Sequence, residues 1–101
     1  MKKVRITAIA SATHPALSAL FENPIEHACE VQLGQQWVSL GAQRPQGLCL
    51  EAWKTMQPFV EELARGGGHI FGDWMRNPHS AMVSCNDGFR PVSFYIETIE
   101  D

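Results

Sequence analysis

Cysteine and histidine are the side chains with the most distinctive chemistry in this 101-residue sequence, which has three of the first and four of the second. Cys29, Cys49 and Cys85 lie in separate segments, and with His27 or His69 they can supply the ligands of a Cys₃His zinc site. No Cys-x-x-Cys pair, the usual core of such a site, is present. Because free cysteines are small, apolar and often buried, the simpler interpretation makes them core residues.

A catalytic thiol is a second interpretation of the same residues. Cys49 begins the longest helical segment, where the helix dipole favours the thiolate. His69 is a candidate base, with His27 and His79 as alternatives, and Cys85 is a second candidate nucleophile. The structural alternative places Cys49 on the buried apolar stripe of the helix.

Aromatic and charged side chains form a third group of candidates, because small-molecule pockets combine apolar walls with a few polar groups. The six candidate ligand-binding residues are Trp53, Phe71, Asp73, Trp74, Asp87 and Arg90. The alternative for each is structural, with the tryptophan of the long helix in the core and the two turn residues shaping the turn.

The turn at Asn86-Asp87-Gly88 brings Cys85 and Arg90 close together. Pro91 holds the preceding arginine extended, and its guanidinium offers five donors suited to a carboxylate. We therefore expect this turn to face the loop that carries Asp73 and Trp74. In the alternative, the arginine pairs internally with an aspartate and only fastens the loop.

Hydrophobic periodicity predicts the elements that must position these side chains. Strands are expected at Lys3–Ile9, Trp37–Leu40, Ala81–Cys85 and Val92–Glu97, a short helix capped by Thr13, and a long helix at Cys49–Arg65. Residues 25–33 fit either a strand or a helical turn. The chain is predicted to be one α+β domain over residues 1–101, with about four mostly antiparallel strands and both helices on one face.

Two features of the long helix lead to further expectations. Trp53 shares an apolar stripe with Cys49, Met56 and Val60, so we expect it to pack against the sheet. Pro58 removes one backbone hydrogen bond and predicts a kink or a split.

Charge and composition exclude several function classes. The net charge is −3 and the basic residues are scattered, so the basic stripe that nucleic-acid binding needs is missing. The sequence has no basic amphipathic helix for a membrane surface, no apolar stretch of about 20 residues for a membrane span, and no signal-peptide core. An odd cysteine count favours a reducing compartment, and we expect a cytoplasmic protein.

Helices on one face would leave the other face of the sheet partly bare. We expect Tyr95, Ile99 and Trp37 there, and a homo-oligomer, favoured as a two-fold dimer, to cover it.

Several short motifs run through most of the chain. They are Gly47-Leu48-Cys49, Ala52-Trp53, Gly67-Gly68, Trp74, and Cys85-Asn86-Asp87-Gly88-Phe89-Arg90-Pro91-Val92 with Phe94. In these the chain resembles a family of short prokaryotic proteins of similar length and no established function. It departs from the family pattern after Cys29, where Glu30 replaces a proline. The resemblance implies a fold class and three cysteine positions, and no activity.

The expected function is therefore binding of a small ligand or a partner protein, through the aromatic loop at 71–79 and the turn at 85–90. The alternative is a cysteine-dependent enzyme or a Cys/His zinc site, and catalysis is left open.

Overall fold

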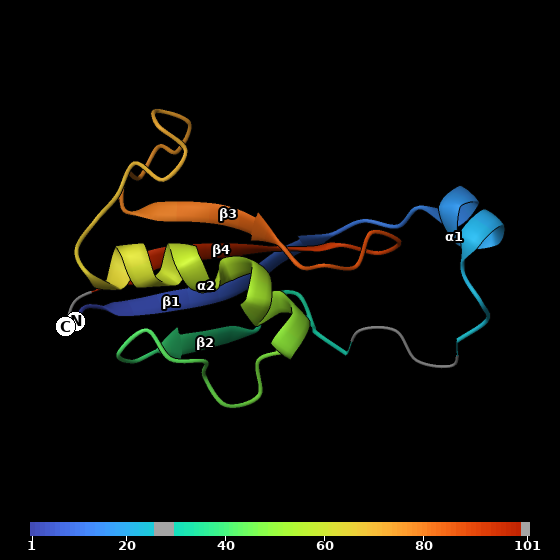
Figure 1. Ribbon diagram of the computed structural model, residues 1–101, viewed down its shortest axis with the longest axis horizontal. Helices are drawn as coiled ribbons and strands as arrows, with labels where there is room; N and C mark the ends of the chain where they lie inside the picture. The colour runs from blue at the N-terminus through green and yellow to red at the C-terminus, as the bar shows by residue number, and fades with distance from the viewer. Residues whose placement is uncertain (26–29, 100–101) are drawn as a thin grey trace.

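A four-stranded antiparallel sheet is the framework of the computed structural model, which describes residues 1–25 and 30–99 (Figure 1). The elements in chain order are β1 (Lys3–Ser11), α1 (Pro15–Phe21), β2 (Gln36–Ser39), α2 (Leu50–Ala64), β3 (Ser80–Ser84) and β4 (Val92–Ile99). The strand order is β2-β1-β4-β3, and all three pairings are antiparallel. The predicted α+β fold with one long and one short helix is confirmed.

Alternation along the strands directs one face of the sheet to the core. In β1 the side chains of Val4, Ile6 and Ala8 are buried, as are Phe94 and Ile96 in β4. Because neighbouring side chains of a strand point to opposite faces, the residues between them form the open face. The sheet therefore has one apolar face for α2 to cover.

Helix α2 covers that face with residues at helical spacing. Trp53 is only 7% exposed, and Met56, Val60 and Leu63 are fully buried. The prediction that Trp53 packs in the core is confirmed. A helix with one such stripe is stabilised by burial against the sheet rather than by its own hydrogen bonds.

The interior proline does not split α2. The helix runs unbroken for 15 residues through Pro58. Pro58 lies on the exposed side, so the Lys54 carbonyl that loses its helical hydrogen bond is open to water. The helix ends at Ala64 with Arg65 as its C-cap residue, and Gly66 follows with a φ of 91°. This left-handed conformation, which glycine adopts without steric cost, turns the chain away from the helix axis.

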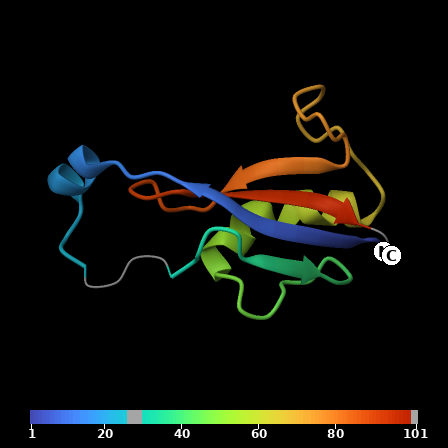
Figure 2. The same ribbon diagram turned by 180° about the vertical axis from the view of Figure 1, so that it is seen from behind.

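Helix α1 lies beyond one end of the sheet, not on the face that α2 covers (Figures 1 and 2). Its N-cap residue is His14 instead of the expected Thr13, and it contributes no buried side chain among the described residues. The arm that carries it helps to make the molecule long, with extents of 43 × 30 × 20 Å. The expectation that both helices lie on one face of the sheet is therefore wrong for α1. This helix is too short to span the sheet, and it lies beyond the end of the sheet.

The open face matches the sequence expectation in part. Tyr95 lies there, opposite Thr7 of β1 and Met82 of β3. Trp37 does not, because its register partner is the buried Ile6, so both point to the core. No helix in the described part of the chain is long and apolar enough to cross a lipid bilayer.

Candidate functional site

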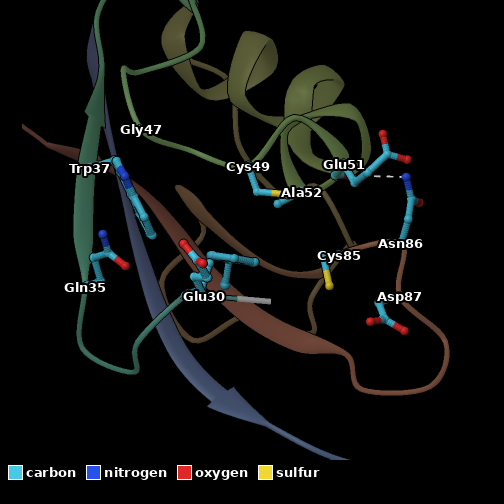
Figure 3. Close-up of a pocket in the computed structure, with 12 residues that line it drawn as sticks. Glu30, Gln35, Trp37, Gly47, Cys49, Glu51, Ala52, Cys85, Asn86 and Asp87 are labelled. Carbon is cyan, nitrogen blue, oxygen red and sulfur yellow. Dashed lines mark hydrogen bonds between the residues drawn. The ribbon is translucent and has the colours of Figure 1, made fainter. Parts of the chain in front are cut away.

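A cavity of about 660 Å³ opens between the first turn of α2, the start of β2 and the turn that joins β3 to β4 (Figure 3). Its apolar wall includes Ala52 and the rings of Trp37 and Phe94, which lie 6.1 Å apart and tilted by 55°. Gly47, with a φ of 86° that glycine adopts without strain, carries the chain past the indole of Trp37. The loop before α2 thus forms one side of the cavity.

Both cysteines in the described part of the chain line this cavity. Cys49 is the N-cap residue of α2 and is exposed, whereas Cys85 is half-buried at the end of β3. The amide of Val92 donates a hydrogen bond to Cys85 Sγ at 3.4 Å. The interpretation of Cys49 as a buried stripe residue is wrong, because the N-cap backbone is not helical and its side chain precedes the apolar stripe.

Two of the three candidate histidine bases lie far from Cys49. His69 and His79 both follow the C-terminal end of α2, where His79 Nδ1 lies 3.1 Å from the carbonyl oxygen of Gly67. A 15-residue helix is about 22 Å long, so its length separates them from Cys49. His69 and His79 are therefore wrong as bases for Cys49, and the third alternative, His27, lies outside the described residues.

The zinc site anticipated from the sequence cannot be assembled from the residues that are described. His27 and Cys29 lie outside the described residues. Within residues 1–25 and 30–99, no three Cys, His, Asp or Glu side chains are grouped so as to hold a metal ion.

Asp87 and Arg90 form an ion pair within the turn that borders the cavity. The carboxylate accepts hydrogen bonds from the amides of Phe89 at 2.8 Å and Arg90 at 3.2 Å, and from Arg90 Nη1 at 2.9 Å. Arg90 Nη2 also donates to Glu22, at the end of α1. The alternative in which Arg90 pairs internally with an aspartate is confirmed. The second partner, Glu22, lies 68 residues away in the sequence, and no local pattern pointed to it.

These contacts shift the pKa values of Asp87 and Arg90 in the directions that favour their charged forms. Partial burial alone would raise the pKa of the Asp87 carboxyl, but the two amide hydrogen bonds and Arg90 lower it below its ordinary value. The hydrogen bond to Glu22, opposed by burial, raises the pKa of Arg90. The turn is therefore held by an ion pair at neutral pH.

The aromatic loop at 71–79 lies at the opposite end of the sheet. Phe71 stacks edge-on against Phe59 with centroids 5.8 Å apart, and Trp74 next to it is 84% exposed. The loop precedes β3 and the turn follows it, so a five-residue strand, about 17 Å long, separates the two. The expectation that Asp73 and Trp74 face the turn is wrong.

The six candidate ligand-binding residues are thus divided among three places. Trp53 is in the core, Phe71, Asp73 and Trp74 belong to the far loop, and Asp87 and Arg90 belong to the turn. Of the six, only Asp87 lines the cavity.

Several residues that line the cavity were not among the candidate site residues of the sequence analysis. They are Glu30, Gln35, Trp37, Glu51, Asn86 and Phe94. The side chain of Asn86 donates to the carbonyl oxygen of Glu51 at 3.2 Å, which ties the turn to the start of α2. Hydrogen bonding and charge from Lys54, 2.7 Å away, lower the pKa of Glu51. The sequence offered one sign of a role for these residues, which is that Asn86 follows Cys85 in the motif at 85–92.

No protein-family model, curated protein or solved structure matches this chain. The resemblance seen in the sequence motifs remains a prediction.

Proposed function

We propose that the protein binds a small molecule in the cavity at the start of α2. The observation that carries the proposal is the cavity itself, because about 660 Å³ lies within the range of small-molecule sites and its wall is mainly apolar. Of the two segments expected from the sequence to bind the ligand, the turn at 85–90 borders this cavity. The loop at 71–79 does not line it, so the proposal leaves that loop out.

The lining favours a ligand with a flat apolar body and a cationic end. The rings of Trp37 and Phe94 suit the apolar body. Glu30, Glu51 and Asp87 give the rim three carboxylates, of which Glu51 is paired with Lys54 and Asp87 with Arg90. Among the ion pairs of the described residues, Glu30 takes no part, so its carboxylate is available to a positively charged group.

Thiol chemistry in the same cavity is the second candidate function. It is favoured by the presence of both described cysteines in one lining, with Cys49 exposed at the N-cap of α2. This candidate includes the cysteine-dependent enzyme and the soft-metal or zinc site that the sequence left open.

A screen of small aromatic amines, followed by amide and indole NMR shifts, tests the first proposal. We expect the Trp37 indole signal to move and that of the exposed Trp74, at the other end, to stay. Cys49→Phe fills the mouth of the cavity and should abolish binding, whereas Cys49→Ser, the matched control, should retain it. Binding lost in Cys49→Ser, or metal found in the purified protein, would favour thiol chemistry. Amines that bind without moving the Trp37 signal would contradict the proposed cavity.

The cytoplasmic location and the homo-oligomer expected from the sequence also remain proposals. The free state of Cys49 and Cys85 supports a reducing compartment. Fractionation of cells that express the protein tests the location, and the molecular mass in solution tests the oligomer.

A further inference from the structure

Helix α1 turns its apolar side to solvent. Leu20 and Phe21 are 73% and 75% exposed, and Leu17, on the same side, is 42% exposed. The side that meets the rest of the chain is the polar one, through Ser18 and Glu22 beside Arg90. A surface helix of a globular protein does the reverse, since its apolar stripe normally faces the core.

This exposed helix is nevertheless firmly attached to the β3–β4 turn. The amide of Ala12 donates to the carbonyl oxygen of Pro91 at 3.0 Å, and that of His14 to Phe89 at 2.8 Å. The ion pair between Glu22 and Arg90 fixes the other end of the helix. A seven-residue helix is not stable through its own hydrogen bonds alone. Because α1 is fixed in place by these contacts while its apolar side stays exposed, we infer that this side binds another surface.

The start of α2 and the β3–β4 turn, which border the cavity, lie toward the end of the sheet beyond which α1 is placed (Figures 1 and 2). In a two-fold dimer joined at this end, each α1 can therefore meet the cavity of the other copy, and both contacts form at once. We propose that the protein is such an arm-exchanged dimer, in which the Leu20–Phe21 edge of each copy covers the apolar cavity of the other. The ligand site would then be complete only in the dimer, a step that rests on the proposed function.

The available area is that of a small interface. A fully exposed side chain of this kind offers roughly 60–120 Å² of apolar surface, of which Leu17, Leu20, Phe21 and Ile25 keep 42%, 73%, 75% and 51% exposed. Two arms and two acceptor surfaces together therefore remove roughly 600–1,200 Å² from water on this scale. The upper value reaches the lower limit of stable interfaces, which bury about 1,200–2,000 Å² in total.

The charge of the arm favours a second copy over a membrane. Residues 15–21 of α1 have no charged side chain, so the helix can approach the acidic rim of the cavity without repulsion. A helix that lies on anionic lipid needs Lys or Arg on its polar face, and α1 has Ser18 and Glu22 there.

Molecular mass in solution tests the dimer. We expect light scattering at micromolar concentration to give twice the chain mass, and Leu20→Asp with Phe21→Asp to give the monomer with unchanged far-UV circular dichroism. Met82→Asp, on the open face, is the matched control and should remain a dimer. A monomeric wild type, or a double variant that stays dimeric, would overturn the proposal.

Cross-linking tests the contact itself. Oxidation of Phe21→Cys with diamide should give a covalent dimer whose linked peptides, identified by mass spectrometry, join residue 21 of one copy to Cys49 or Cys85 of the other. Leu40→Cys, exposed at the far end of β2, should give no such link. Absence of the residue 21 link would overturn the arrangement. A dimer that binds no amine at the Trp37 indole would contradict only the proposed function, because the mass and the cross-link do not depend on ligand.

Discussion

Replacement of Trp53 by alanine measures how much of the stability comes from packing α2 on the sheet. A buried aromatic side chain removes about 150–250 Å² from water, worth about 4–6 kcal/mol at 25 cal/mol per Å². Trp53 is 7% exposed, and the alanine methyl group would stay buried. The expected loss of unfolding free energy is therefore about 3–5 kcal/mol, as for other large-to-small core changes.

Urea melts followed by far-UV circular dichroism provide the measurement, because dichroism does not depend on the tryptophan that is removed. Trp74→Ala is the matched control, since Trp74 is 84% exposed and contacts Phe71 at a centroid distance of 5.9 Å. Its expected loss is below about 1 kcal/mol. If Trp53→Ala leaves no folded protein, Trp53→Phe can be measured instead. It keeps an aromatic ring in the site and should lose less of the free energy of unfolding. A loss below about 1 kcal/mol for Trp53→Ala, or equal losses for the two alanine variants, would refute this account of the core.

Four further predictions concern the turn and α2. Arg90→Met removes the link to α1, so limited proteolysis of the segment before β2 should become faster while the far-UV spectrum is kept. Because the folded-state pKa of Asp87 is lowered, its contribution to stability is complete above its unfolded pKa of about 3.9 and is lost as the pH falls through the lower folded value. Wild type should therefore lose stability relative to Asp87→Asn only below about pH 4, and parallel acid melts of the two would contradict this. Pro58→Ala, on the exposed side of α2, should raise the free energy of unfolding by about 1–3 kcal/mol in urea melts. Gly66→Ala should lower it by about 1–2 kcal/mol, because Gly66 has a φ of 91°; no loss would show that the chain relaxes there.

Local pattern sufficed to predict most elements. The alternation in Lys3–Ile9 and Val92–Ile96 and the stripe through Trp53 are properties of neighbouring residues, and the structure has these strands and this helix. The face on which Trp37 lies was missed, because it depends on register with Ile6, a contact between distant segments.

The site was predictable only where it coincided with a single segment. The internal pair of Asp87 and Arg90 lies within one turn, and the sequence anticipated it. The cavity brings together three segments, around Gln35, Cys49 and Cys85, and its position depends on which ends of α2 and β3 meet. The aromatic loop drew attention because of its composition, although β3 holds it at the other end of the sheet.

The central position of β1 has a consequence for synthesis of the chain. Its partner β4 is the last strand to be made, and the ion pair between Arg5 and Glu97 joins positions 92 residues apart. At about 5–20 residues per second, β1 leaves the ribosome roughly 5–20 s before it can pair with β4. During that interval β1 can pair with β2, but its other edge, which later pairs with β4, stays open and is a target for aggregation and for chaperones. The apolar residues of this strand include Val4 and Ile6. Lys3 and Arg5, alternating with them, give the nascent strand the charge that opposes such association.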